Sequence, residues 1–277
     1  MSGLSLLFAL MLAGSASEPP QAAAGADPDK AAIIQAVLDY ADGYYDGAAD
    51  RMTRAVSPLL TKRGLMNRPP VAPYLVQMNA EMLIEATRRG GGKTPPEKRG
   101  IATEVLAVDA EMASARVFST GFNDYLHLIK RDGEWRLVNV LWHPPVSATS
   151  AADADKGAVE QALKDLVTAL IAADASRVQA LLHPLVTWRH LVPSPTGRRV
   201  VVEENADSML AVMARGQGLK VKPEECVPVV LGVDHDIASA KVTMGPMPVY
   251  LHLAKQSGQW RVVNALDYIP APAAAPR

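Results

Sequence analysis

Two pairs of residues that could transfer protons or hold a polar ligand recur at a fixed spacing. His127 and His252 are 125 residues apart (252 minus 127), and the same spacing separates Asn139 from Asn264. Histidine is the side chain that most readily exchanges protons near neutral pH, and an asparagine amide both donates and accepts hydrogen bonds. Such groups serve proton-transferring enzymes, but they also hold neighbouring segments together in non-catalytic domains.

A second set of candidate groups differs between the two halves of the chain. Tyr40 and Tyr44 occur in the first half, and the second half has leucine in place of both. Conversely, His183 and Trp188 occur in the second half, where the first half has serine and lysine. This difference predicts that one half binds a ligand while the other is structural.

The two halves are copies of one unit. Residues 124–142 read DYLHLIKRDGEWRLVNVLW, and residues 249–267 read VYLHLAKQSGQWRVVNALD. Chance gives roughly one identity over such a window, so the match indicates a duplication. The match extends upstream to Arg63 and Arg189, where a guanidinium could bind an acidic ligand or form an ion pair between elements.

Each copy shows the hydrophobic periodicity of three helices followed by four strands. In the first copy we expect helices over about 31–45, 50–58 and 74–89, and strands over about 101–109, 112–119, 123–131 and 134–142. In the second copy we expect the first helix over about 158–172, the third over about 203–215, and strands near 226–234, 237–244, 248–256 and 259–267. Helices followed by an antiparallel meander predict an α+β fold.

This order of elements, together with the closing strands that carry Tyr-Leu-His-Leu, Lys, Gly, Trp-Arg and Val-Asn, resembles the nuclear transport factor 2-like superfamily. The closer resemblance is to its putative lumazine-binding branch, which is related to the SnoaL-like polyketide cyclases. The resemblance covers nearly all of 30–145 and 155–270, once each. It implies two tandem cone-shaped domains, each with three N-terminal helices packed on a curved antiparallel sheet. The superfamily includes isomerases, dehydratases, cyclases and non-catalytic binding domains, so the fold alone does not define an activity.

Alternation along the strands assigns side chains to the two faces of each sheet. The resemblance places the face with Trp135 inside the cone, and we predict ligand-pocket residues on the helices and near this face: Tyr40, Tyr44, Arg63, Met78, Met82, Asn139, His183, Trp188, Arg189 and Asn264. The opposite face is apolar where a solvated face would be polar. We therefore expect the two sheets to pack together as an intrachain pseudo-dimer, through Tyr125, His127, Trp142, Tyr250 and His252. Each histidine is expected to donate a hydrogen bond across this interface.

The ends of the chain differ in composition from the repeats. An apolar run from Leu4 to Leu12 is too short to span a bilayer, and the small residues after it predict a signal peptide and export to the periplasm or the cell exterior. Because no cysteine follows the run, we expect no lipid anchor. The predicted division is a signal peptide at 1–17, a flexible leader at 18–30, a first domain at 31–145, a linker at 146–156, a second domain at 157–270 and a flexible tail at 271–277.

Composition narrows the function. A formal net charge of −1 and 5% aromatic residues argue against a nucleic-acid partner. The single cysteine, Cys226, excludes an intramolecular disulfide, and the absence of ligand spacing leads us to expect no metal or cofactor. No membrane contact is expected of the mature form.

The sequence favours a non-catalytic tandem domain that binds a small apolar or amphipathic ligand, or a protein partner, through one cone. A cofactor-independent isomerase, dehydratase or cyclase is the first alternative, and an interaction scaffold with filled cones is the second. An open cone with several inward titratable groups would indicate the enzyme. A cone filled by Met78, Met82 and leucines would indicate the scaffold.

Overall fold

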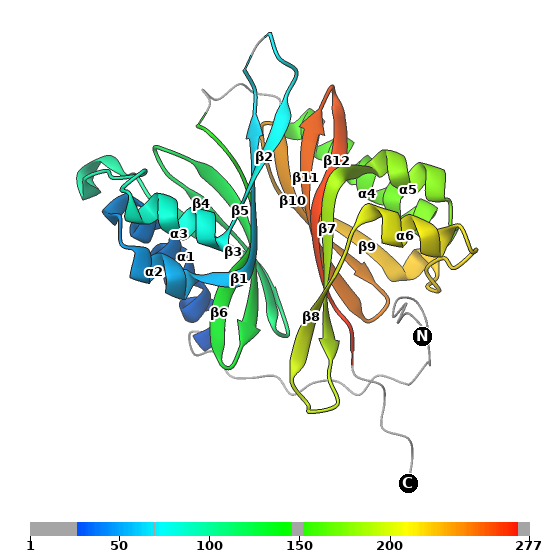
Figure 1. Cartoon of the computed structure of the whole chain (residues 1–277). Helices are drawn as coiled ribbons and strands as arrows, with labels where there is room; N and C mark the ends of the chain where they lie inside the picture. Colours follow the sequence, from blue (N-terminus) through cyan, green and yellow to red (C-terminus); the bar gives the residue numbers. More distant parts are fainter. Residues whose placement is uncertain (1–26, 69, 146–151, 271–277) are drawn as a thin grey trace.

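The computed structural model describes residues 27–68, 70–145 and 152–270, which form two units with the same order of elements (Figure 1). The predicted signal peptide and tail lie outside the described residues, as do most of the predicted leader and the first part of the predicted linker. The first unit comprises α1 (Pro28–Asp46), α2 (Ala49–Ala55), β1 (Val56–Met66), β2 (Tyr74–Asn79), α3 (Ala80–Arg88), η1 (Pro96–Lys98), β3 (Ala102–Asp109), β4 (Met112–Phe118), β5 (Asn123–Arg131) and β6 (Glu134–His143). The second comprises α4 (Ala152–Ile171), α5 (Ala175–Leu181), β7 (Leu182–Pro193), β8 (Arg199–Glu204), α6 (Ala206–Met213), η2 (Pro223–Glu225), β9 (Cys226–Asp234), β10 (Ile237–Met244), β11 (Met247–Gln256) and β12 (Gln259–Tyr268).

The predicted α+β fold with two tandem domains is confirmed, and each sheet is larger than the sequence indicated. The first sheet has the order β2-β1-β6-β5-β4-β3, and the second has the equivalent order β8-β7-β12-β11-β10-β9. All neighbours are antiparallel except β1–β6 and β7–β12, which are parallel. The sheets are therefore mixed, where the sequence analysis predicted purely antiparallel ones.

The additional strands correct the predicted third helix of each copy. Tyr74–Asn79 forms β2, and the helix begins only at Ala80. Asn79 marks the boundary, because its side chain accepts a hydrogen bond from the backbone N–H of Met82 and so caps the helix. Asn205 caps α6 in the same way through the N–H of Ser208. The apolar residues on both sides of the boundary between β2 and α3 have helical spacing, so the sequence pattern does not indicate the strand.

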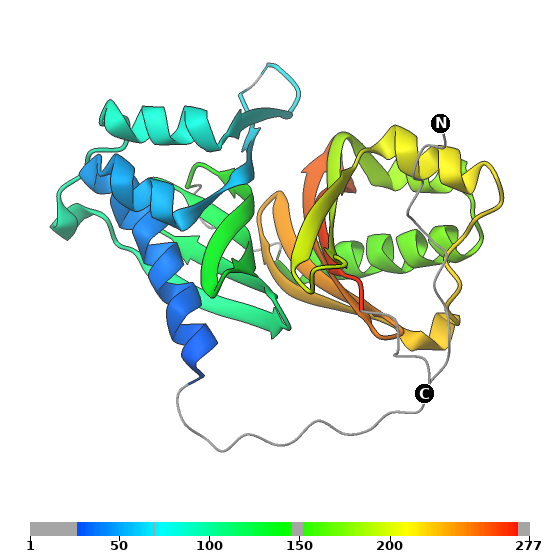
Figure 2. The same cartoon turned by 60° about the horizontal axis from the view of Figure 1, so that its bottom comes forward.

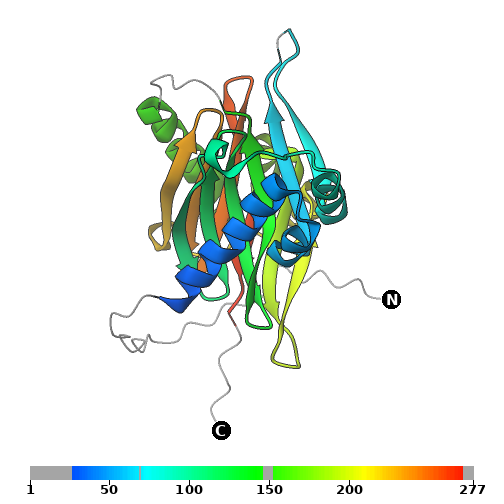
Figure 3. The ribbon, with the colours of Figure 1, turned by 90° about the vertical axis from the view of Figure 1, so that its left-hand side faces the viewer.

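The helices cover the outer face of each sheet, and the two sheets lie between the two helical layers (Figure 2). Figure 3 shows α1 lying diagonally across the first sheet. Each domain has its own apolar core between its helices and its sheet, with Val37 and Leu126 in the first and Leu163 and Leu251 in the second. In the described ranges, no helix has the length and apolar character needed to cross a membrane.

The inner faces of the two sheets contact each other, as predicted. The rings of His127 and His252 stack with centroids 3.6 Å apart, and each histidine also neighbours the tyrosine of the other domain, Tyr250 or Tyr125. The side chains of all four residues are buried. The histidines do not donate across the interface as expected. Instead, each Nδ1 is 3.2 Å from the amide nitrogen of the asparagine in its own domain.

A β-bulge in each closing hairpin corrects the predicted faces of several residues. The pairing of β5 with β6 shifts between His127 and Leu128, so that His127 lies opposite Asn139 and Val138 is the extra residue. A bulge interrupts the two-residue alternation of side chains. Asn139 therefore shares the interface side with His127, while Trp142 packs against the first core instead of the interface. The same shift at Val263 places Asn264 at the interface.

Two buried arginines join the domains reciprocally. Arg63 donates from Nη1 to Asn264 Oδ1 and to the carbonyl of Val263, the latter at 3.0 Å, and from Nη2 to Thr187 Oγ1 at 2.8 Å. Arg189 donates from Nη1 to Asn139 Oδ1, and from Nη2 to the Leu59 carbonyl at 2.8 Å and to Thr61 Oγ1 at 2.9 Å. Both arginines are at most 2% exposed. Arg63, Arg189, Asn139 and Asn264 are thus interface residues, and their prediction as pocket residues is wrong.

The two arginines differ in their remaining partner. Arg189 Nε donates to Glu203 Oε1 at 2.8 Å, whereas Arg63 Nε donates to the neutral Gln77 Oε1 at 3.1 Å. Burial, and then repulsion from Arg189, lower the pKa of Arg63 to about 10. Arg63 is therefore the less well compensated of the two cations.

Replacing Gln77 by Glu gives Arg63 the carboxylate that Arg189 already has. We expect Gln77→Glu to increase the free energy of unfolding by about 0.5 kcal/mol, since the carboxylate stays largely exposed. Glu203→Gln, the reverse change in the other domain, is expected to lower it by a similar amount. Urea unfolding of both variants measures this, and a loss of stability in Gln77→Glu would contradict the assignment.

The stacked histidines predict acid sensitivity. Burial and Arg189 lower the pKa of His127 to about 3, and burial, then His127 and Arg63, lower the pKa of His252. Above pH 6.5 both folded and unfolded states are neutral at these residues, but below it only the unfolded state takes up the protons. Stability should therefore fall as the pH drops below about 6.5, and His127 alone contributes about 1.4 kcal/mol per pH unit down to about pH 3. His252 adds to this fall in the same direction.

Urea unfolding across this pH range checks the slope. The double variant His127→Gln/His252→Gln should show a shallower decline than the natural chain, because the other titratable groups are the same in both. An unchanged slope in the double variant would show that these histidines do not cause the acid sensitivity.

Candidate functional site

A buried polar cluster lies inside the first domain, at the meeting point of α1, β1 and β5. Lys62 Nζ donates to Asp124 Oδ2 at 2.8 Å and also to the Tyr40 hydroxyl, which in turn donates to Asp124 Oδ2. The three residues are between 2% and 7% exposed. The second carboxylate oxygen, Asp124 Oδ1, is buried and has no hydrogen-bond partner among the described residues. The cluster therefore leaves one strong acceptor unused.

Burial and the shared carboxylate set the protonation states. Burial, followed by the charge of Asp124 and its hydrogen bond, raises the pKa of Tyr40 well above its ordinary value. Burial lowers the pKa of Lys62, and the ion pair with Asp124 opposes that change. The result is a lysine–aspartate ion pair beside a neutral phenol at neutral pH.

Aromatic rings surround the lysine. Its ammonium lies 4.9 Å from the ring centroid of Trp142, 5.2 Å from that of Tyr40 and 5.7 Å from that of Phe122. Such contacts stabilise a partly desolvated cation. Trp142 is half-buried, as are Tyr44, which contacts Phe122, and Met78, which pairs with Lys62 across β1 and β2. These three half-buried residues are linked to members of the cluster by a ring contact, by strand pairing or by a cation–π contact.

The second domain does not reproduce this cluster. In place of Tyr40, Lys62 and Asp124, the second copy has Leu166, Trp188 and Val249. Trp188 is buried and donates from its indole Nε1 to Asp267 Oδ2 at 2.6 Å. The two cones therefore hold different chemistry on the same backbone.

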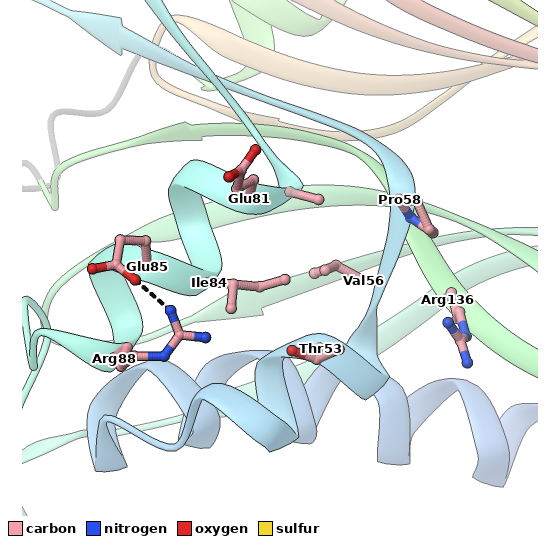
Figure 4. A pocket seen from close by; sticks show the side chains of 9 residues that line it. Thr53, Val56, Pro58, Glu81, Ile84, Glu85, Arg88 and Arg136 are labelled. Carbon is pink, nitrogen blue, oxygen red and sulfur yellow. Dashed lines mark hydrogen bonds and ion pairs between the residues drawn. The ribbon is translucent and has the colours of Figure 1, made fainter.

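The first domain also has a groove between α2, α3 and the start of β1 (Figure 4). Its volume is about 550 Å³. Figure 4 shows side chains reaching it from α2, α3, β1 and β6. Its lining consists of Thr53, Val56, Pro58, Ala80, Glu81, Ile84, Glu85, Arg88 and Arg136. Val56 and Ala80 also belong to the buried core of this domain, so the groove has an apolar floor.

The predicted pocket residues that are not at the interface lie in several different places. Tyr40, Tyr44 and Met78 lie at or beside the buried cluster, and Trp188 lies in the second cone. Met82 projects outward with 55% exposure and fills no cone. His183 Nδ1 accepts from the backbone N–H of Leu185 at 3.0 Å, and burial, followed by the nearby Arg63, lowers its pKa. The prediction is wrong for Met82.

Sequence reasoning missed the two charged members of the cluster, Lys62 and Asp124. A usable signal existed, because each is a charged residue at a position where the second copy has an apolar or aromatic one. In the described ranges, no group of three or more His, Cys, Asp or Glu side chains is arranged to hold a metal ion.

Comparison with known proteins gives a family match to the first domain and several similar solved structures. Residues 28–143 match the family described as putative lumazine-binding. The solved structures that resemble the chain include nuclear transport factor 2-like proteins of unknown function from Silicibacter pomeroyi (18% identity, 42% of this chain and 94% of that one, TM-score 0.36) and Shewanella baltica (21%, 43% and 95%, 0.35). A ketosteroid isomerase-like protein from Erwinia carotovora is also similar (15%, 44% and 99%, 0.30). No curated protein matches.

The family match covers nearly the whole of the first copy, residues 28–143, which resembles the putative lumazine-binding family. The second copy repeats the strand order of the first, so the chain carries this fold twice.

The buried ion pair predicts a large single-mutant effect. We expect Lys62→Met to lower the free energy of unfolding by about 3 to 5 kcal/mol, because it leaves the Asp124 carboxylate buried without its counter-charge. The double variant Lys62→Met/Asp124→Leu removes both charges and should recover most of the loss. Lys130→Met is the control, since its ion pair with Asp29 is about one-third exposed and should cost less than 1 kcal/mol. Urea unfolding of all three measures the effect, and a double variant as unstable as Lys62→Met would contradict the ion-pair account.

Proposed function

We propose that this protein is an exported, non-catalytic tandem domain whose first copy binds a small amphipathic molecule in the groove between α2 and α3. The observation that carries the proposal is the groove itself, an apolar-floored cavity of about 550 Å³ with charged side chains at its edge. Small-molecule sites are mostly apolar clefts of roughly 300 to 1,000 Å³ with a few polar groups that fix orientation. The groove meets both conditions.

The charges at the groove suggest how a ligand would be oriented. Arg88 forms an ion pair with Glu85 on α3, and Arg136 Nη2 forms one with Glu134 at 2.7 Å. Because a guanidinium has five donors, each arginine keeps donors free for a second acceptor. A ligand with an apolar body over Val56 and Ile84 and a carboxylate or carbonyl at one end fits this arrangement.

The second copy supports binding by one half only. The second copy has Ala211 and Ala214 where the first has Glu85 and Arg88. It has Leu210 in place of Ile84. The second copy therefore keeps an apolar residue at the floor, Asp207 at the position of Glu81 and Arg261 at that of Arg136, but it loses the Glu85–Arg88 ion pair. A ligand selected by that pair would bind the first domain.

The buried cluster supports the non-catalytic part of the proposal. A general acid or base works best when its pKa lies near the working pH, and the raised pKa of Tyr40 moves its hydroxyl away from that range. Lys62 is held by both Asp124 and Tyr40. The donors of Lys62 and Tyr40 both point at Asp124 Oδ2, an arrangement typical of a structural network.

A cofactor-independent isomerase, dehydratase or cyclase is the second candidate. The observation in its favour is Asp124 Oδ1, a buried carboxylate oxygen without a partner among the described residues. A substrate would reach it by displacing half-buried neighbours such as Met78 and Trp142. The scaffold alternative, with a protein partner in the groove, would be indicated if no small molecule binds there.

Export is proposed on the basis of the N-terminal sequence. The apolar run followed by small residues has the pattern of a signal peptide. N-terminal sequencing of protein purified from its own host tests this part, and an intact N-terminus at Met1 or Ser2 would contradict it.

Filling the groove tests the ligand site. We expect Ile84→Trp to weaken binding of the anionic amphipathic dye 1-anilinonaphthalene-8-sulfonate at least tenfold, because the larger ring occupies the apolar floor. Leu210→Trp, the equivalent change in the second domain, is the matched control and should leave dye affinity unchanged. Fluorescence titration measures both, and equal affinities for the two variants would contradict the assigned groove.

Native mass spectrometry of the chain purified from its own host addresses the natural ligand. A co-purifying small molecule that is absent from Ile84→Trp and present in Leu210→Trp would support the proposal.

A further inference from the structure

The second cone has a histidine–aspartate pair where the first cone has a glycine and the indole of Trp142. Trp142 lies beside Gly64 in the first domain, and a Cβ atom on Gly64 would come within 2.5 Å of the indole Nε1. The second domain has His190 at the position of Gly64 and Asp267 at that of Trp142. These two exchanges depend on each other, because an imidazole fits only where the large ring has been removed.

His190 and Asp267 form a tightly paired and buried unit. Imidazole Nδ1 lies 2.8 Å from Asp267 Oδ2 and 2.9 Å from Oδ1, and Trp188 Nε1 donates to the same carboxylate. The three residues are between 2% and 4% exposed. Burial alone would lower the pKa of His190, but Asp267 and then Glu204 outweigh it and raise the pKa to about 9. At neutral pH the imidazole therefore carries a proton on both nitrogens.

Two atoms of this group face each other without a partner. His190 Nε2 and Glu204 Oε2 are both buried, and neither has a hydrogen-bond partner among the described residues. They are 3.9 Å apart, which is too far for a direct hydrogen bond. A single oxygen placed about 2.8 Å from each would accept from the imidazolium N–H and donate to the carboxylate. A hydroxyl group has both capacities, whereas a carboxylate or an ammonium has only one.

We propose that the second domain binds a hydroxyl-bearing small molecule, an alcohol or a phenol, whose oxygen bridges His190 Nε2 and Glu204 Oε2. Glu204 is the member nearest to solvent, with a side-chain exposure of 14%, and it lies on the edge strand β8. The hydroxyl enters from the side of β8. This site shares no residue with the groove of the first domain and does not depend on the function proposed for that groove.

The test follows His190 directly by nuclear magnetic resonance of the full chain labelled with ¹⁵N-histidine. The spectrum of His190→Asn assigns the resonance among the six histidines. Phenol and cyclohexanol are the probes, and toluene and methylcyclohexane, which lack the hydroxyl, are their controls. We expect at least one hydroxyl probe to shift the His190 Nε2 signal in a saturable way at pH 7, while neither control does.

Two variants separate this site from its alternatives. Glu204→Gln keeps the size of the side chain but removes the charged acceptor, and it should raise the dissociation constant of the hydroxyl probe about tenfold or more. Ile84→Trp in the first domain should leave that constant unchanged. The proposal is overturned if neither hydroxyl probe shifts the His190 signal, which would mean that the gap holds only water. It is also overturned if the controls shift the signal equally, or if Glu204→Gln binds as tightly as the natural chain.

Discussion

Burying two guanidinium groups between two sheets is the constraint on which this molecule depends. An arginine removed from water is tolerated only when most of its donors find acceptors. Arg63 and Arg189 obtain theirs mainly from the opposite domain, where an asparagine oxygen, a backbone carbonyl and a threonine hydroxyl lie within reach of each. A single domain would leave most donors of its arginine without acceptors. It would also leave the oxygen of its asparagine without the arginine that donates to it. The two domains are therefore expected to be stable as one unit, and sliding one sheet against the other would break both sets of contacts together.

The β-bulges at Val138 and Val263 make this arrangement possible. Without them, Asn139 and Asn264 would face the cones, since strict alternation places them on the same side as Trp135 and Trp260. With them, each asparagine lies beside the histidine of its own domain and presents its oxygen to the arginine of the other. The recurring residues Tyr, His, Arg and Asn all meet here. The two copies are most similar in sequence in the closing hairpin because both contribute the same side chains to one pseudo-symmetric interface.

The same geometry explains what could be predicted from the sequence. The repeat, the α+β class and the packing of the sheets through Tyr125, His127, Tyr250 and His252 follow from periodicity and from an apolar face that has to be covered. The bulges do not, because an inserted residue changes the facing of the residues after it without changing the composition. Strand β2 was also hidden, since Leu75, Met78, Met82 and Leu83 have helical spacing although a strand ends at Asn79. Repetition does not point to Lys62 and Asp124, because the second copy has Trp188 and Val249 at their positions.

Differences between the two cones are therefore more informative about function than the residues that repeat. They occur as groups of substitutions in which each change accommodates the others. Lys62, Gly64, Asp124 and Trp142 in the first cone correspond to Trp188, His190, Val249 and Asp267 in the second. Each set is internally consistent: the first pairs its lysine with an aspartate, and the second pairs its histidine and indole with another aspartate. Changing any one member alone would leave a buried charge unpaired or force an imidazole against an indole. Since a shared interface fixes the sheets, the interiors and outer helices are the parts free to change, and they have changed toward two different kinds of polar chemistry.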